Sequence, residues 1–359
     1  MRERLERELH DRYAIERELG RGGMASVWLA HDRRDDRDVA IKVLDADLAG
    51  AIGADRFVRE IRLTTRLQHP GIVPVLDSGV LPAGSDVALP WYAMPYIAGE
   101  SLRTRLQRET QLPIGDAVRI ARAIAGALLV AHRQGIVHRD IKPENVIVSG
   151  DDVFVVDFGI AKALLDTGAE RLTSTGLAIG TPVYMSPEQA HGEAGIDGRS
   201  DIYSLGLVAF NMLTGRLPFP SRTAQESVIM RLTEPPVRLA LMRPQIAWTP
   251  KVQEVMDKAL QRDAALRYAS ANEFGRALSA AVKGLSSAAP GTTKVMDEPE
   301  AWVPPTRVSA TPSTPSEGRR MGRVAAVAGI VVLVAGVFAY LATRGGADAD
   351  ATRRTPDPA

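Results

Sequence analysis

The sequence predicts an α+β protein followed by a flexible linker and one membrane-spanning helix. Short β-branched runs separated by turn-forming residues recur up to residue 156 and indicate strands and hairpins. Phe57, Ile61 and Leu67 fall near helical spacing within residues 55–67. Residues 324–343 carry no charge, and about 20 such residues match the thickness of a bilayer.

The first predicted hairpin has a glycine-rich tip. Its apolar segments are residues 15–19 and 27–30, and Gly20, Gly22 and Gly23 lie between them. Because glycine has no side chain, backbone N–H groups at such a tip can approach phosphate oxygens. A glycine-rich stretch alone is a weak signal, so the assignment depends on the motifs that follow.

The next predicted strand, residues 39–43, contains a lysine among apolar residues. Ala40 and Lys42 share one face of this strand, so the ammonium group can reach nucleotide phosphates while the methyl group lines the base site. A lysine in such a place needs an anionic partner. Glu60, on the predicted helix, is the candidate, since Lys42 otherwise has nothing to pair with; the alternative is an exposed helix carboxylate.

Residues 137–145 and 156–159 contain the polar groups that phosphoryl transfer from ATP needs. Asp140 can orient and deprotonate an attacking hydroxyl, and Lys142 can lie beside the moving phosphoryl group. Asn145 and Asp157 are hard oxygen ligands suited to Mg²⁺. A hairpin over residues 146–156 would bring these two ligands together. Either motif alone could be a solvated loop, but their order and spacing together favour a site.

From about Tyr13 to about Val282 the sequence resembles a bacterial transmembrane serine/threonine protein kinase of the eukaryotic-like (Hanks) type. This resemblance implies a bilobal protein-kinase fold with a sheet-rich N-lobe and a helical C-lobe. ATP and Mg²⁺ (or Mn²⁺) would lie in the cleft between the lobes, beside a hinge at residues 94–97. The side chains and glycines that it places around the nucleotide are Leu19, Gly20, Gly22, Gly23, Val27, Ala40, Lys42, Met94, Tyr96, Ile97 and Ile147.

The sequence departs from the family pattern at two places. Ala25 replaces the third glycine of the glycine-rich loop, which we expect to be tolerated because three glycines remain. Pro95 occupies a hinge position that often holds an acid. Proline keeps its carbonyl acceptor but has no N–H, so the hinge donor must come from a later residue.

The resemblance also implies regulation between Asp157 and Glu188. Thr173 and Thr175 lie where related kinases are phosphorylated, and Arg139 is the cation that such a phosphate would pair with. The alternative is a hydroxyl-rich loop that is simply solvated. Thr181 would contact the protein substrate, and Lys142 together with Thr181 accompanies serine/threonine specificity. Two structural expectations complete this region: Asp201 holds the catalytic-loop backbone, and Arg267 pairs with Glu188.

Composition agrees with these expectations. The chain has 359 residues, 45% hydrophobic and 24% charged, enough for a two-lobed core and a tail. A formal charge of +1 argues against bulk nucleic-acid binding. The absence of cysteine excludes disulfides, thiolate metal sites and cysteine nucleophiles. Residues 1–12 are highly charged and do not read as a secretory signal.

The predicted organisation has four parts. They are a kinase domain (13–283), a disordered juxtamembrane linker rich in proline, serine and threonine (284–323), a transmembrane helix (324–343) and a short extracytoplasmic tail (344–359). A buried soluble helix is the alternative for the apolar run. Because ATP is cytoplasmic, we expect a single-pass protein of the cell membrane with its kinase domain inside. Small residues such as Ala325 and Gly329 have a spacing compatible with a homodimer.

Three other functions compete with phosphorylation of protein substrates. A membrane-tethered pseudokinase scaffold would lack Lys42, Asp140, Asn145 or Asp157, all of which are present. A small-molecule kinase would lack a peptide-docking segment like residues 180–188. A structural membrane anchor would need no catalytic cleft.

Overall fold

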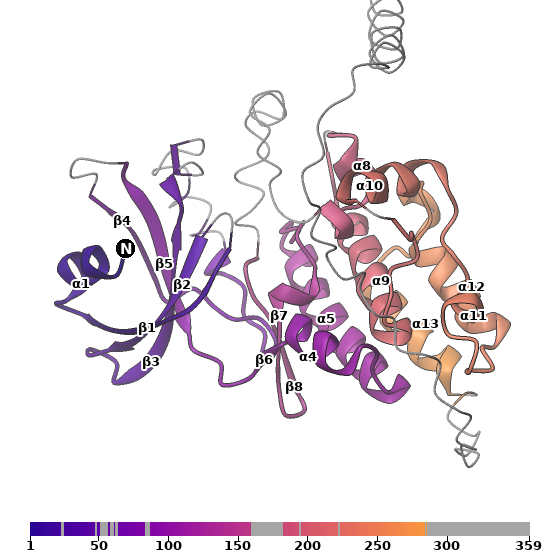
Figure 1. Ribbon diagram of the computed structural model, residues 1–359, viewed down its shortest axis with the longest axis horizontal. Helices are drawn as coiled ribbons and strands as arrows, with labels where there is room; N and C mark the ends of the chain where they lie inside the picture. The colour runs from indigo at the N-terminus through magenta and orange to yellow at the C-terminus, as the bar shows by residue number, and fades with distance from the viewer. Residues whose placement is uncertain are drawn as a thin grey trace, which may run out of the picture. The chain divides into compact units, whose positions relative to one another are not determined.

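The computed structural model of the protein (Figure 1) describes residues 1–22, 25–46, 49, 50, 57, 61, 64–82, 87–158, 182–193, 195–221, 223–283 and 285. The chain divides into two units, Met1–Thr292 and Thr293–Ala359. The predicted linker beyond residue 285, the predicted span and the tail lie outside the described residues. Among those that are described, no helix is both long and apolar enough to cross a membrane.

The N-lobe is built on an antiparallel sheet of five strands in the order β1-β2-β3-β5-β4. The strands are β1 (Tyr13–Arg21), β2 (Ala25–Asp32), β3 (Arg37–Leu44), β4 (Asp77–Leu81) and β5 (Leu89–Pro95). The predicted first hairpin and the strand after it are confirmed as β1, β2 and β3. In the sheet, Lys42 on β3 is paired with Val27 on β2 and Tyr92 on β5.

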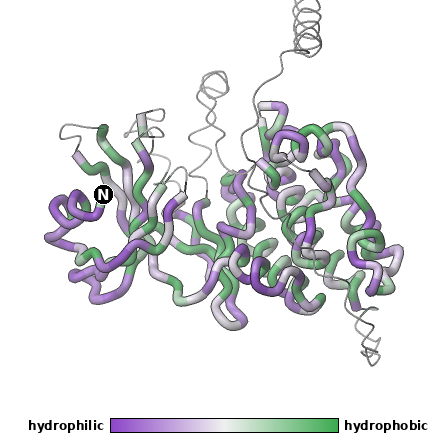
Figure 2. Tube along the Cα trace, in the orientation of Figure 1, coloured by the Kyte–Doolittle hydropathy of each residue, from purple (hydrophilic) through white to green (hydrophobic). Residues whose placement is uncertain are grey.

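Helix α1 (Arg2–Leu9) lies before the predicted start of the kinase domain and packs against β1. Figure 2 shows this helix as mostly hydrophilic. Its one buried side chain, Leu5, joins the apolar cluster that contains Tyr13 and Trp91. We did not predict this helix, because six of its eight residues are charged and only two leucines, Leu5 and Leu9, mark the packed face.

The predicted helix over residues 55–67 is described at only a few positions. Phe57, Ile61 and Thr64 are helical, and a turn at Thr65 and Arg66 follows them. Phe57 and Ile61 are 1% exposed and pack in a cluster with Tyr92 on the inner side of the sheet. Glu60 lies outside the described residues, so its pairing with Lys42 stays a prediction.

The C-lobe is mainly helical and lies beyond the sheet in Figure 1. Its helices are α4 (Leu102–Glu109), α5 (Ile114–Arg133), α8 (Pro187–Ala190), α9 (Gly198–Thr214), α10 (Ala224–Thr233), α11 (Leu239–Met242), α12 (Pro250–Ala259) and α13 (Ala271–Val282), with 3-10 turns at Pro143–Asn145, Pro182–Tyr184 and Ala264–Leu266. Every residue of α9 from Ser200 to Thr214 is buried. A helix that is buried on all sides provides a fixed support for the loops that pack against it.

A three-stranded sheet carries the catalytic segments. It consists of β6 (Glu100–Ser101), β7 (Val146–Ser149) and β8 (Asp152–Val155), in that order. The β7–β8 pair confirms the predicted second hairpin. Val155 also forms backbone hydrogen bonds with Gly71 and Val73, which join the segment after the N-lobe helix to this hairpin. The backbone just before Asp157 is therefore held from two sides.

Candidate active site

The catalytic loop after α5 is held by a buried carboxylate of α9. Asp201 is completely buried and accepts hydrogen bonds from the backbone N–H groups of His138 (2.8 Å) and Arg139 (2.7 Å). The ring of His132, at the end of α5, lies 2.7 Å from the same carboxylate. The predicted role of Asp201 is confirmed. His132 was missed, because nothing in the sequence indicates that the last turn of α5 faces α9.

A glycine makes room for the His132 contact. A Cβ atom on Gly198, in the first turn of α9, would lie 2.5 Å from Nδ1 of His132. Real Cβ atoms do not approach other atoms so closely, so any larger residue must displace the imidazole. Gly198 therefore sets the position of a ring that contacts Asp201.

The ring of His138 joins the catalytic loop to the segment that contains Asp157. Its Nδ1 accepts a hydrogen bond from the N–H of Asp140 (3.2 Å), so Nε2 carries the proton and donates to the carbonyl of Val156 (2.9 Å). The ring also meets Phe158 edge to face, with 4.6 Å between centroids. The residues before and after Asp157 are thus both fixed against the loop that carries Asp140.

Asp140, Asn145 and Lys142 form a compact polar group. The amide nitrogen of Asn145 donates to the backbone carbonyl (2.8 Å) and to Oδ2 (2.9 Å) of Asp140. Lys142 Nζ lies 2.7 Å from the same Oδ2. Because the Asn145 amide directs its nitrogen at Asp140, its carbonyl oxygen is available to a cation. Among the described residues, the side-chain contacts of Asp140 engage Oδ2, so Oδ1 could accept a proton from a substrate hydroxyl.

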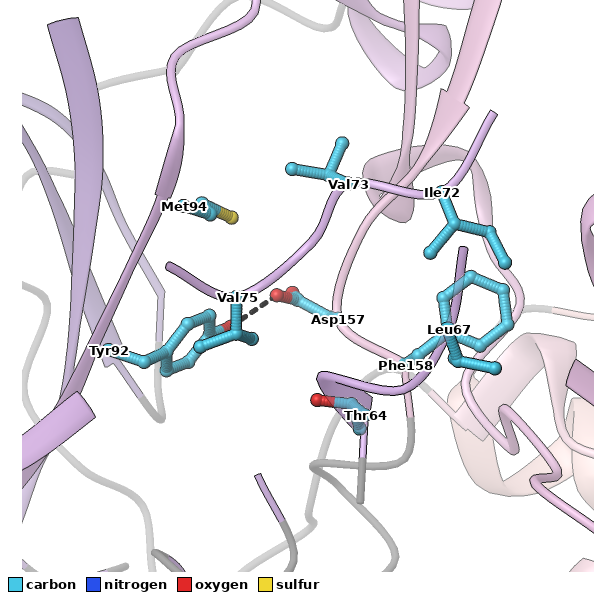
Figure 3. A pocket seen from close by; sticks show the side chains of 9 residues that line it. All are labelled: Thr64, Leu67, Ile72, Val73, Val75, Tyr92, Met94, Asp157 and Phe158. Atoms are coloured by element: carbon cyan, nitrogen blue, oxygen red, sulfur yellow. Dashed lines mark hydrogen bonds between the residues drawn. The ribbon is translucent and has the colours of Figure 1, made fainter. Parts of the chain in front are cut away.

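Asp157 lies between the lobes and is bound by two side chains of the N-lobe sheet. Lys42 Nζ is 2.5 Å from its Oδ2, and the hydroxyl of Tyr92 donates a hydrogen bond to its Oδ1 (Figure 3). The assumption that Lys42 has no acidic partner besides Glu60 is therefore wrong. Sequence separation hid this contact, since residues 42 and 157 meet only when the two lobes pack together.

Electrostatics keep Asp157 charged and Tyr92 protonated. Burial alone would raise the pKa of Asp157, but the charge of Lys42 and the hydrogen bonds from Lys42 and Tyr92 lower it overall. Burial and the neighbouring charge of Asp157 raise the pKa of Tyr92 well above its usual value. Asp157 is thus a carboxylate anion, as a metal ligand must be, and the Tyr92 hydroxyl is a donor.

Backbone strain is present at two residues of the site. Arg139 and Asp157 have φ angles of +64° and +67°, a region that non-glycine residues rarely adopt. Such a conformation costs about 1–3 kcal/mol and persists only where the surroundings enforce it. At Arg139 the N–H bond to Asp201 does so, and at Asp157 the contacts with Lys42 and Tyr92 do so.

The side chains predicted to surround a nucleotide lie on four neighbouring strands of the N-lobe sheet, just after β5, and on β7. Gly20 pairs with Val27, and Ala40 pairs with Met94. The N–H of Tyr96, in the predicted hinge, already donates to the carbonyl of Asp38 (3.2 Å). A hinge donor for the base would therefore come from Ile97. Of the residues predicted to surround the nucleotide, those that lie on these strands or just after β5 are Leu19, Gly20, Val27, Ala40, Lys42, Met94, Tyr96 and Ile97. Ile147 lies on β7.

A metal ion would find two protein ligands here, Asp157 and Asn145. The backbone N–H of Val156 donates to the carbonyl of Asn145 (3.0 Å), which places the two ligands at the same end of the β7–β8 hairpin. Nowhere in the described part of the chain do three or more His, Asp or Glu residues gather as a metal cage. Two hard oxygen ligands fit Mg²⁺, which completes its shell with water and substrate phosphates.

Of the remaining expectations, one is confirmed and several concern residues that the structure does not describe. Arg267 donates to both oxygens of Glu188, at 2.7 and 2.8 Å, which confirms the predicted pair. The guanidinium also lies over the ring of Tyr203. Gly23, Glu60, Thr173, Thr175 and Thr181 lie outside the described residues. Arg139 is 8% exposed, and its guanidinium contacts the carbonyl of Ile196.

Comparison with known proteins agrees with this geometry. Residues 13–276 match the protein kinase domain family. The chain belongs to this family. Its fold is similar to the crystal structure of the PknI kinase domain from Mycobacterium tuberculosis, with a TM-score of 0.59 and 30% sequence identity over 75% of this chain and 95% of that one. The predicted bilobal kinase fold is confirmed.

Two curated bacterial proteins illustrate the relationship. The probable serine/threonine-protein kinase SCO3848 of Streptomyces coelicolor is 41% identical over 280 residues, 77% of this chain and 41% of the relative. The serine/threonine-protein kinase PknB of Mycolicibacterium smegmatis is 40% identical over 294 residues, 81% of this chain and 46% of the relative. The chain thus spans less than half the length of these relatives.

Proposed function

We propose that the protein is a serine/threonine protein kinase that transfers the γ-phosphate of ATP to hydroxyl groups of proteins. The arrangement of Asp140 carries this proposal. Lys142 and Asn145 contact one oxygen of its carboxylate, which leaves the other oxygen for an acceptor hydroxyl. Relatives that are named serine/threonine-protein kinases support the same activity.

In the proposed reaction, Asp140 orients the acceptor hydroxyl and takes its proton as the oxygen attacks the γ-phosphorus and ADP leaves. Lys142 lies beside the phosphoryl group, and Lys42 moves from Asp157 to the nucleotide phosphates. Asn145 and Asp157 would hold Mg²⁺ or Mn²⁺, which supplies neutralising charge to the phosphate oxygens. The contribution of the chain is positioning and electrostatic stabilisation.

The test is transfer of labelled γ-phosphate to the chain itself and to a generic basic protein, with Asp140→Asn as the control. We expect transfer by the wild type and a large loss of turnover in the variant, with ATP affinity little changed, because Asp140 faces the acceptor. Equal transfer by both proteins would contradict the assignment. Nucleotide binding without transfer would favour a pseudokinase scaffold, and transfer to small molecules alone would favour a small-molecule kinase.

A cavity beside the Pro182–Tyr184 turn supports a protein as the substrate. It measures about 490 Å³ and lies between α4, α9, α10 and this turn, whose residues Val183 and Tyr184 line it. Val183, Leu217 and Phe219 provide apolar lining, and the charged lining side chains are Arg103 and Arg216. A mixed groove of this kind suits an extended peptide better than it suits a compact metabolite.

Regulation by autophosphorylation at Thr173 and Thr175 is part of the proposal. A phosphate there would pair with Arg139, and each hydrogen bond could contribute roughly 1.5–3 kcal/mol. Since about 1.4 kcal/mol shifts a two-state loop tenfold, alanine at both positions should reduce transfer to other proteins by about tenfold or more. Mass spectrometry locates the phosphates. Phosphorylation confined to residues 284–318, with full activity in the double variant, would contradict this mechanism.

Membrane attachment rests on residues 324–343, whose uncharged length and flanking arginines support a single span. Cytoplasmic ATP supports a kinase domain on the inner side of the cell membrane, and the small-residue spacing supports homodimer contacts in the span. A chain that ends near residue 284 should be soluble and active, because the linker adds no core. An insoluble product, or one that does not bind nucleotide, would disprove the boundary.

A further inference from the structure

Tyr92 was not among the residues predicted for the site, yet its hydroxyl touches the proposed metal ligand Asp157. The residue lies on β5, directly beside Lys42 in the sheet register. Its side chain is 1% exposed. The two neighbours on adjacent strands therefore reach the same carboxylate, Lys42 at Oδ2 and Tyr92 at Oδ1.

The ring of Tyr92 and its hydroxyl have different surroundings. The ring packs in an apolar cluster with Phe57, Ile61 and Leu44, and the Phe57 and Tyr92 centroids are 6.2 Å apart. Phenylalanine would fill the same space. Only the hydroxyl leaves this cluster, and it points at Asp157 in Figure 3. A buried hydroxyl is costly unless it is hydrogen-bonded, so this contact accounts for the presence of tyrosine.

We propose that Tyr92 is a positioning residue that orients Asp157 for the metal ion through Oδ1. The inference rests on the proposed kinase function. Each carboxylate oxygen has two lone pairs, so Oδ2 can bind a cation once Lys42 has moved to the nucleotide, while Tyr92 keeps Oδ1 in place. Partners of this kind set the orientation of a ligand, and their loss typically weakens metal binding about 10- to 100-fold.

Two features make the hydroxyl suited to this task. It comes from an internal strand of the five-stranded sheet, whereas Asp157 belongs to the segment after β8, so the contact fixes the ligand relative to the N-lobe. Asp157 also has a positive φ angle, which its neighbours must enforce. If Lys42 leaves Asp157 during the reaction, the hydrogen bond from Tyr92 still holds the carboxylate.

The test measures Mn²⁺ affinity directly, without turnover. The full-length chain is purified in detergent as wild type and as Tyr92→Phe, and Mn²⁺ binding is followed by electron paramagnetic resonance with saturating AMP-PNP. We expect the dissociation constant for Mn²⁺ to rise about tenfold or more in the variant. Affinity for AMP-PNP without metal should stay within about twofold, because no contact with the nucleotide is lost.

Tyr13→Phe is the matched control. Tyr13 is also buried in this sheet, and its hydroxyl donates to a carboxylate, Asp77, at 3.1 Å. The same chemical change at Tyr13 should leave Mn²⁺ affinity unaltered. A second variant, Tyr92→Met, should behave like Tyr92→Phe, since it too lacks the hydroxyl.

The outcomes separate the inference from the proposed function. If Tyr92→Phe binds Mn²⁺ as tightly as the wild type, Tyr92 has no positioning role. Tighter binding would mean that the hydroxyl competes with the metal, which also overturns the inference. If the wild type binds neither AMP-PNP nor Mn²⁺, the proposed kinase function itself fails.

Discussion

The two carboxylates at the centre of the site are held in different ways. Asp140 belongs to a loop that is fixed within the C-lobe, because Asp201 on α9 binds the backbone beside it. Asp157 is held by Lys42 and Tyr92, side chains from the other lobe. The first arrangement is part of the core, whereas the second depends on contact between lobes. Substitutions that disturb the first should therefore cost stability and activity, and those that disturb the second should cost mainly activity.

The largest expected effect on phosphate transfer is that of Lys42→Met. The charge that would meet the nucleotide phosphates disappears, and we expect transfer to fall about 1000-fold. Lys42 and Asp157 are 21% and 15% exposed, so water can reach the remaining carboxylate, which also keeps its hydrogen bond from Tyr92, and the protein should remain folded. Lys251→Met, on the exposed side of α12, is the control. Wild-type transfer by folded Lys42→Met protein would refute the site.

Asp201→Asn should reduce both the free energy of unfolding and the turnover. In the wild type both carboxylate oxygens accept backbone N–H groups, so the amide NH2 of asparagine would have to face one of these donors in a completely buried place. We expect a loss of about 3 kcal/mol in the free energy of unfolding and about 100-fold in turnover, because Asp140 shifts with the loop. Thermal unfolding and phosphate transfer are both measured. Asp197→Asn, at the exposed N-cap of the same helix, should change neither stability nor turnover. Normal turnover in Asp201→Asn would show that Asp201 is not needed to position the catalytic loop.

Gly198→Ala should have a smaller effect of the same kind. The added methyl group displaces His132 and weakens its contact with Asp201. We expect a loss of about 1.5 kcal/mol in the free energy of unfolding and of at most roughly tenfold in turnover. Gly115→Ala, on an exposed turn of α5 where a Cβ meets no atom, should instead stabilise the protein slightly. Equal results for the two variants would show that His132 does not need the glycine.

Asp32→Asn should leave turnover unchanged and alter only stability. Burial would raise the pKa of Asp32, but hydrogen bonds from Arg12 and from the backbone of Arg34 lower it overall. A lowered pKa stabilises the fold at pH values above 3.8, the usual value of the group, and this contribution is lost as pH falls through the lower folded value. Acid unfolding of the wild type and variant should therefore converge at low pH. Asp151→Asn, fully exposed, is the control.

Site residues that lie close together in the sequence were easier to predict than those whose partners lie on other elements. Asn145 and Asp157 were predicted because the hairpin between them brings them together, and Asp140 was predicted from the motif at residues 137–145. Asp201 and the Glu188–Arg267 pair followed from the family resemblance. Tyr92 and His132 were missed because their roles depend on which strand or helix lies opposite. The signal for Tyr92 was present in part: a tyrosine in an apolar strand needs a partner for its hydroxyl.

Two other features could not be inferred from residue types. The positive φ angles of Arg139 and Asp157 arise from tertiary hydrogen bonds. Arginine and aspartate rarely adopt such angles by themselves, so the residue types did not indicate them. The contact between Lys42 and Asp157 joins residues 115 positions apart, so strand periodicity could identify the lysine face but not the carboxylate opposite it.

The space behind Met94 has a consequence for inhibitor design. Tyr92, Met94, Asp157 and Phe158 help to line a cavity of only about 10 Å³ there, room for roughly one water molecule. A compound that extends past Met94 must first displace the Tyr92 ring or Phe158 from its packing. If the proposed activity holds, compact inhibitors that stay in front of Met94 should bind this protein better than elongated ones. Tyr92→Ala should make the protein sensitive to the elongated class.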